Sequence, residues 1–243
     1  MNRVTLRFAI GLSMVVTAGS GVSAQEPADL VIRQGRLARD KGDIESLQAL
    51  IHSADAESTR TNSFDANLRT ALLDAYLVEA AHDHQNDIVV KQAAQGGIAA
   101  AERAVKLKAE SSEAHRLAGE LLGELIPHVF AGGMRYGAHS TEEIEKAVRL
   151  DPHNPSAYAA RGKNYFFRPK TFGGDKEKAI DTWKEAIAIA PTSDAAETAH
   201  IWLAKAYQSL GKSENATAEI NEALKMNPER LFSKLVQRQL AAK

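Results

Sequence analysis

Three times along the second half of this 243-residue chain, an alanine stands five residues before a proline at the end of an amphipathic stretch. The pairs are Ala147 and Pro152, Ala186 and Pro191, and Ala223 and Pro228, which recur after 39 and 37 residues. Proline cannot continue a helix, and a small residue lets neighbouring helices approach closely. A period of this size is typical of chains that stack helix pairs rather than fold around one compact core.

Composition narrows the classes of function. The 30 basic residues nearly balance the 31 acidic ones, which argues against a nucleic-acid or membrane-surface footprint. Aromatic residues make up only 6% of the chain and alanine is abundant, which favours helix over strand. Cysteine is absent, so the sequence predicts no disulfide, no thiolate nucleophile, no cysteine-bound zinc and no lipoprotein anchor.

The N-terminus has the layout of a secretory signal peptide. Two arginines within the first seven residues precede the uncharged, mostly apolar stretch Phe8–Ala18, and small residues lead up to Ala24. The alternative is a membrane anchor, but the apolar run is shorter than the roughly 20 residues that a spanning helix needs. We therefore predict a signal peptide over residues 1–24, cleavage between Ala24 and Gln25, and a periplasmic or secreted protein.

The unit that ends at Pro228 carries the most complete motif. Its apolar residues follow helical spacing before and after Gly211, and glycine commonly ends a helix by taking the left-handed conformation. The order resembles that of the tetratricopeptide repeat (TPR): a large residue, leucine beside a small residue, tyrosine, glycine, two alanines around an apolar residue, and proline. The matching residues are His200, Leu203, Ala204, Tyr207, Gly211, Ala216, Ile220, Ala223 and Pro228.

Weaker copies of this motif precede the last unit. Tyr158, Gly162 and Trp183 occupy motif positions in one unit, and His115 opens the unit before it. The resemblance implies an all-α, right-handed solenoid of about five helix pairs with a C-terminal capping helix. An ordinary helical bundle is the alternative. The predicted ranges are 111–152, 156–191 and 193–228 for the clear repeats of a solenoid spanning 25–243, and 229–241 for the capping helix.

Two units have longer turns than the family period allows, and both turns contain paired glycines. In the earlier unit we expect a loop over Pro127–His139, with Ser140 and Glu143 as the capping box of the next helix. In the later unit the insertion supplies candidate partner contacts, since aromatic and arginine side chains anchor many interfaces. Alternatively, Phe166 and Phe172 pack the turn and the glycines only let it fold. The candidate contacts are Arg168, Phe172, Gly173 and Gly174.

In the TPR family the first helix of each pair lines a concave groove. Carried over by position, the resemblance assigns partner contacts to Arg116, Glu120, Lys163, Phe166, Phe167, Lys205 and Gln208. It also directs Asp74 and Ile201 into the groove. Lysines then lie toward the C-terminal end and acids toward the middle, an arrangement that would orient an extended peptide. A mixed, solvated surface is the alternative. The asparagine of the carboxylate-clamp members is replaced, so that mode of binding is not expected.

The sequence does not predict an enzyme. His82, Asp83, His84 and Asp87 form the densest histidine cluster, but residues two apart on a helix do not face each other, so a solvated helix end is favoured over a metal site. We expect no cofactor. The resulting hypothesis is an exported scaffold of the bacterial cell envelope that binds a protein or peptide, without nucleic acid or stable membrane insertion. The alternative, from a weaker resemblance to transporter-associated periplasmic TPR proteins, is a small-ligand carrier.

Overall fold

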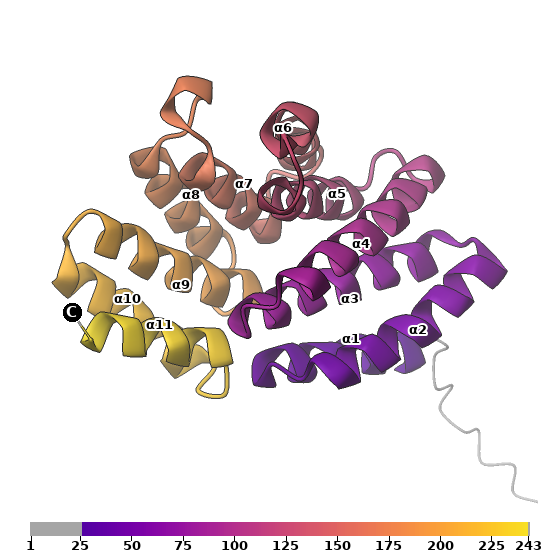
Figure 1. Ribbon diagram of the computed structural model, residues 1–243, viewed down its shortest axis with the longest axis horizontal. Helices are drawn as coiled ribbons and strands as arrows, with labels where there is room; N and C mark the ends of the chain where they lie inside the picture. The colour runs from indigo at the N-terminus through magenta and orange to yellow at the C-terminus, as the bar shows by residue number, and fades with distance from the viewer. Residues whose placement is uncertain (1–25, 243) are drawn as a thin grey trace, which may run out of the picture.

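A computed structural model describes residues 26–242, and helices follow one another through this part of the chain as a curved stack (Figure 1). The predicted signal segment, 1–24, and its cleavage site lie outside the described residues. None of the described helices is long and apolar enough to cross a membrane. The helices are α1 (Glu26–Lys41), α2 (Ile44–Thr61), α3 (Phe64–Asp83), α4 (Asp87–Leu107), α5 (Ser112–Leu125), α6 (Gly132–Leu150), α7 (Pro155–Phe167), α8 (Lys176–Ile189), α9 (Asp194–Ser209), α10 (Ser213–Met226) and α11 (Leu231–Ala241), with short 3-10 helices η1 (Ile126–His128) and η2 (Lys170–Phe172).

The helices pack as consecutive antiparallel pairs, α1 with α2 through α9 with α10, and each pair also contacts the next. The predicted all-α helix-turn-helix solenoid is confirmed. The first helices of the pairs, α3, α5, α7 and α9, contact one another in sequence and form an inner layer. The predicted capping helix, α11, covers α9 and α10, and it also contacts α1 and α3 at the other end of the chain (Figure 1).

Helix ends follow local chemistry. The first turn of a helix leaves backbone N–H groups without partners, and a preceding polar side chain accepts one or two of them. The capping side chains are Asp43, Ser63, Asn86, Ser111, Asn154, Asp175 and Ser193. Gly42 and Gly211 have φ values of 68° and 72° where α1 and α9 end. These left-handed positions explain why glycine stands at both turns.

The predicted loop over Pro127–His139 is wrong for most of its length, because α6 begins at Gly132. Ser140 is therefore inside the helix and caps nothing. Its hydroxyl is buried and donates a hydrogen bond of 2.7 Å to the carbonyl of Gly119. A Cβ at Gly119 would lie 2.8 Å from the carbonyl oxygen of Ser140, so α5 and α6 meet there through backbone. The extra residues of this unit mainly lengthen a helix.

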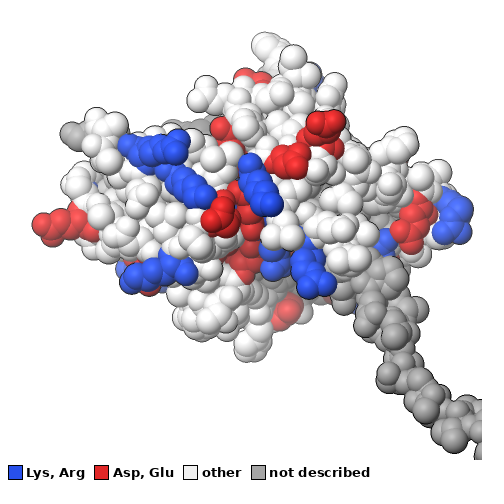
Figure 2. Space-filling model, turned by 90° about the horizontal axis from the view of Figure 1, so that it is seen from below, with Lys and Arg blue, Asp and Glu red and all other residues white. Residues whose placement is uncertain are grey.

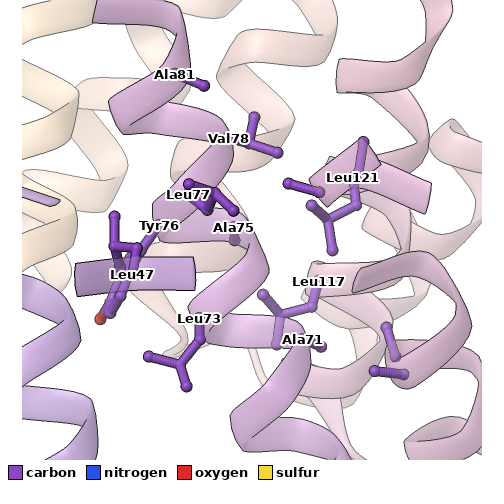
Figure 3. Packing of buried hydrophobic residues seen from close by; sticks show 14 of the residues in the cluster. Leu47, Ala71, Leu73, Ala75, Tyr76, Leu77, Val78, Ala81, Leu117 and Leu121 are labelled. Atoms are coloured by element: carbon purple, nitrogen blue, oxygen red, sulfur yellow. The ribbon is translucent and has the colours of Figure 1, made fainter. Parts of the chain in front are cut away.

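The core is built mainly from alanine and leucine. In the N-terminal half it centres on α3, whose Leu73 and Leu77 pack with Leu117 and Leu121 of α5 and with Leu47 of α2 (Figure 3). A separate cluster in the C-terminal half surrounds Trp183, which is fully buried and donates a 3.1 Å hydrogen bond to the carbonyl of Ala159. Small residues therefore set the close helix spacing, and a few large ones fill the space between repeats.

Candidate functional site

The charged residues predicted to line the groove are paired with one another. Arg116 is buried and donates to Glu113 at 2.6 Å and to Glu120 at 2.5 Å. Lys163, on the neighbouring first helix, donates to Glu120 at 2.9 Å and also to Glu124. The expected separation of lysines from acids along the groove is therefore wrong at these positions. Arg116, Glu120 and Lys163 belong to one ion-pair network between α5 and α7, which we call the central network.

Electrostatics keep the central network charged. Burial alone would raise the pKa of Glu124, but the Lys163 ammonium and a hydrogen bond from His82 outweigh burial and hold that pKa well below its usual range. Burial alone would lower the pKa of Lys163, yet Glu120 and Glu124 raise it above its ordinary value. Removing one charged side chain would leave its partner as an uncompensated charge in a partly desolvated site. These residues therefore primarily hold neighbouring repeats together.

Asp74 is another groove residue that the fold places elsewhere. It is buried between α3 and α4, with its carboxylate against Gly96 and Gly97, where added Cβ atoms would lie 3.3 and 2.8 Å from its side chain. Burial, reinforced by the charge of Asp55, raises its pKa to about 8. Asp74 is consequently a buried acid between helices, and the predicted acidic N-terminal end of the groove loses one of its charges.

A second buried ion-pair network joins the two ends of the solenoid. Arg39 of α1 donates to Asp194 of α9 at 2.7 and 2.8 Å. Arg230, just before α11, donates to Asp40 at 2.9 Å and to Glu79 at 2.6 Å. On the face seen in Figure 2, basic and acidic side chains adjoin across the middle. The contacts of α11 with α1 and α3 are thus accompanied by ion pairs from Arg230 to Asp40 and Glu79 of the same two helices.

The surface that stays open is aromatic, and Trp202 of α9 is at its centre. Four rings surround this partly exposed indole. Trp183 stacks on it at 6.2 Å between centroids, while Phe167 and Phe232 meet it edge-on at 5.3 and 5.5 Å. Phe166 lies 6.4 Å away. Phe167 is 61% exposed, so the cluster reaches solvent rather than closing into a core. Edge-to-face and offset-stacked contacts of this kind stabilise the arrangement of the rings.

Lys205 completes this surface. Its ammonium lies 5.6 Å from the Trp202 ring centre and 5.7 Å from that of Phe232. Within the described chain it makes no ion pair and no hydrogen bond, unlike Lys163, which also lies 5.6 Å from Trp202. Burial lowers the pKa of Lys205, against a smaller opposing effect of Asp83. A half-buried cation without an acidic partner can bind a carboxylate of another molecule at a reduced desolvation cost.

We call Phe167, Trp202, Lys205 and Phe232 the aromatic–lysine surface. Three helices position it, since Phe167 ends α7, Trp202 and Lys205 lie in α9, and Phe232 lies in α11. Gln208, also predicted to contact a partner, is partly exposed on α9 three positions after Lys205. Phe166 and Phe167 therefore lie together with Lys205, whereas Arg116, Glu120 and Lys163 lie in the central network.

The insertion between α7 and α8 is held by a contact with α6 and by the backbone geometry of its own glycines. Arg168 donates a 2.8 Å hydrogen bond to the Thr141 hydroxyl of α6. Gly173 has a φ of 90°, and a Cβ at Gly174 would lie 1.7 Å from the Arg168 carbonyl oxygen. The backbone of this turn therefore requires glycine at both positions. The suggestion that Phe166 and Phe172 both pack this turn is wrong for Phe172, which is 73% exposed, while Phe166 packs against Trp183 and Trp202.

Sequence reasoning missed Trp202 and assigned the groove position to its neighbour, Ile201. Ile201 is fully buried beneath α11 with Ile220 and Val236. The capping helix covers one face of α9, so the face left open is rotated toward Trp202. The available signal was a tryptophan three positions before the predicted groove residue Lys205, but the family's position rule selected the residue before the tryptophan. Phe232 was treated only as part of the cap.

The histidine cluster at the end of α3 has partners within the protein. The His82 ring contacts Glu124 at 2.8 Å, and that of His84 contacts the carbonyl oxygen of Gly42 at 2.8 Å. Among residues 26–242, no group of three or more histidine or acidic side chains is arranged to hold a metal ion. These histidines link the turn after α3 to neighbouring helices.

Comparison with known proteins gives one family match and several similar folds. Residues 197–230 match the tetratricopeptide repeat model. The thermophilic TPR protein TTC0263 of Thermus thermophilus is similar over 89% of this chain and 100% of its own, with 16% identity and a TM-score of 0.62. The HusA haemophore of Porphyromonas gingivalis is similar over 87% and 96%, with 18% identity and a TM-score of 0.55. The curated proteins searched contain no match.

Proposed function

Since this chain is a tetratricopeptide-repeat protein, we propose that it is an interaction scaffold that binds a protein or peptide segment on its aromatic–lysine surface. The segment that fits this surface carries an acidic group next to an aromatic or aliphatic side chain. We place the scaffold in the cell envelope, as the N-terminal sequence suggests, and we assign it no catalytic step.

The observation that carries the proposal is the position of Lys205. Its ammonium lies over two rings, is partly desolvated, and makes no ion pair within the described chain, whereas Lys163 is shared by two acids. A partner carboxylate would gain a charge-assisted hydrogen bond there, at a smaller desolvation cost than at a fully hydrated lysine. The surrounding rings would bury an apolar side chain of the same segment, which is how aromatic anchors contribute most interface energy.

A peptide-binding measurement tests this proposal directly. We would titrate the protein into fluorescently labelled peptides in which an acidic residue flanks leucine or phenylalanine, alongside peptides in which lysine replaces the acid. The acidic–apolar peptides should bind, and Lys205→Glu should weaken them at least tenfold because the new carboxylate repels the peptide's own. Trp202→Ala should have a similar effect through loss of the aromatic platform.

The matched control is Lys184→Glu, which makes the same charge reversal at an exposed lysine of the outer helix α8. It changes net charge equally but is remote from the rings, so affinity should stay within about twofold. The proposal fails if acidic and basic peptides bind equally, or if Lys205→Glu and Lys184→Glu have the same effect. Circular dichroism of each variant separates loss of the surface from loss of the fold.

A small anionic aromatic ligand is the second candidate for the same surface. The specific observation is a cluster of five rings, Trp202 and the four that surround it, with the ammonium groups of Lys163, Lys176 and Lys205 each within 6 Å of a ring of the cluster. A flat ring system could stack on the indole while its carboxylate meets Lys205. The similar fold of the HusA haemophore makes haemin a suitable probe.

The haemin experiment separates the two candidates. A carrier should give a saturable change in the haemin absorption spectrum at one equivalent, and Trp202→Ala should abolish it. A scaffold should bind the acidic–apolar peptides and give no saturable change in the haemin absorption spectrum at the same protein concentrations.

The envelope location is tested by determining the N-terminus of the protein recovered from an exporting host. Mass spectrometry should find Gln25 as the first residue, and retention of Arg3 would overturn the export proposal.

A further inference from the structure

Large apolar side chains that reach solvent gather along one edge of the solenoid. This edge is where the first helix of each pair turns into the second. Phe130 is 94% exposed, Met134 is 85% exposed and Phe172 is 73% exposed. Ile88, in the first turn of α4, is 72% exposed, and Phe167 and Leu210 are further members of the set. Isolated exposed side chains are ordinary, but their alignment on four successive turns is not.

The packing of the first helices places these turns on one edge. α3, α5, α7 and α9 contact one another in order, and all four run toward the turns that bear these side chains. The hydrogen bond from Arg168 to Thr141 ties the insertion before α8 to the adjacent helix α6. The opposite edge is formed by the turns at 108–111, 151–154, 190–193 and 227–230. Within the described chain, only one exposed large apolar side chain, that of Leu107, lies next to these turns.

Charge is distributed unevenly along the same edge. Residues 126–141 contain Arg135, two histidines and no acid, and residues 165–174 contain Arg168, Lys170 and no acid. The next acid, Asp175, accepts hydrogen bonds from two backbone N–H groups at the start of α8. Asp87 lies near His128, with 3.9 Å between carboxylate oxygen and ring nitrogen. Although the whole chain is nearly neutral, its two central turns are therefore locally basic and apolar.

We propose that this edge docks on the surface of an anionic lipid bilayer. Phe130, Met134 and Phe172 would enter the interface between headgroups and acyl chains, while Arg135 and Lys170 would meet lipid phosphates. Phe130 and Met134 project at the turn between α5 and α6, Phe172 projects from the turn between α7 and α8, and a Cβ added at Gly133, next to Met134, would touch nothing within 4 Å. A bilayer accepts separate side chains without shape complementarity, whereas a folded protein partner would need a matching surface. This inference rests on Phe130, Met134 and Phe172, none of which belongs to the aromatic–lysine surface.

The absence of cysteine allows a local test. In Phe172→Cys and Leu107→Cys, a single thiol carries an environment-sensitive fluorophore at the docking edge or at the opposite edge. Vesicles of equal parts phosphatidylglycerol and phosphatidylcholine should shift the emission at position 172 to the blue and leave position 107 unchanged. Pure phosphatidylcholine vesicles should bind at least tenfold more weakly, since the cationic side chains gain nothing there. An unchanged dye at position 172 would overturn the proposal.

Vesicle flotation supplies the matched variants. Phe130→Ser with Met134→Ser and Phe172→Ser should reduce partitioning at least tenfold, because three apolar anchors are lost. Leu30→Ser with Leu107→Ser removes exposed leucines away from the edge and should leave partitioning within twofold. All variants share the same N-terminus, so any binding through it cancels in the comparison. Equal loss in both variants contradicts the proposal, as does concentration-dependent self-association through this edge in light scattering without vesicle binding.

Discussion

Arg39 and Asp194 form a two-armed ion pair across 155 positions of sequence, with nitrogen–oxygen distances of 2.8 and 2.7 Å. The pair joins the first helix of the stack to the start of α9. Arg39 also donates to Asp40 at 2.7 Å, and Asp40 accepts from Arg230. The solenoid is thus held by charge between its ends as well as by contacts between successive repeats.

We predict that Arg39→Ala lowers the free energy of unfolding by about 3–5 kcal/mol, because Asp194 then loses its main partner and Asp40 keeps only Arg230 as a cationic partner. Urea unfolding monitored by circular dichroism measures the change. Arg36→Ala is the control, since the side chain of Arg36 is 49% exposed and approaches Asp194 only to 3.9 Å. Its cost should stay below about 1 kcal/mol. Similar losses in the two variants would show that the buried pair contributes nothing special.

Asp74 predicts an unusual dependence of stability on pH. Its pKa is raised from 3.8 to about 8 by burial, so between these values the folded state holds a proton that the unfolded state has released. Stability should therefore fall as pH rises from about 4 to about 8, by at most about 1.4 kcal/mol per pH unit.

Asp74→Asn should remove that contribution and raise the free energy of unfolding at pH 7 by about 1–3 kcal/mol, with little effect at pH 4. Urea unfolding at both pH values measures the difference. Asp181→Asn, an exposed substitution on α8, should change stability by less than about 0.5 kcal/mol at either pH. If Asp74→Asn behaves in the same way at pH 4 and pH 7, the carboxyl is not buried as described.

Gly162 of α7 lies directly against the indole of Trp183 in α8. A Cβ there would lie 2.3 Å from the indole nitrogen of Trp183, which is fully buried and has no room to move. Gly162→Ala should lower the melting temperature and cost about 1–3 kcal/mol through overpacking. Gly133→Ala is the matched substitution, because no atom lies within 4 Å of its added Cβ in the first turn of α6. That variant should be neutral or stabilise by up to about 1 kcal/mol.

Gly174 tests the insertion before α8. An added Cβ would lie 1.7 Å from the Arg168 carbonyl oxygen, so Gly174→Ala forces the turn to rearrange. We expect trypsin to cut several-fold faster after Lys170, an exposed residue of this turn, with a smaller effect on the global melting temperature. Gly137→Ala, whose Cβ would meet nothing within 4 Å, should leave the cleavage rate unchanged. Unchanged cleavage in Gly174→Ala would mean that the turn does not need the glycine.

The success and failure of the sequence predictions follow the range of the interactions involved. Asn154 and Asp175 directly precede α7 and α8 and cap them, and such caps are readable from sequence because they depend on hydrogen bonds to residues two or three positions away. Ser140 resembled a cap equally well, yet its hydroxyl bonds to Gly119 in another helix. The local pattern did not distinguish the two cases, since only the packing of α5 on α6 decides where α6 begins.

The candidate site shows the same division. The position of Lys205 on an inner helix was predictable from the repeat motif. Its lack of an acidic partner was not, because Lys163 occupies an equivalent position in the preceding repeat and is paired with Glu120 and Glu124. Those acids lie 43 and 39 positions away, so the pairing depends on how neighbouring repeats are stacked.

By itself, the sequence determined that this protein is a stack of helix pairs. Apolar spacing, capping side chains, glycine turns and the alanine–proline register act within one helix or one pair, where local geometry leaves few alternatives. Only the tertiary structure decided which inner residues are available to a partner. The contact of α11 with α1 and α3, the ion pair between Arg39 and Asp194, and the exposure of Trp202 all depend on curvature accumulated over the whole stack. Small rotations between repeats add up to that curvature, and no single motif encodes it.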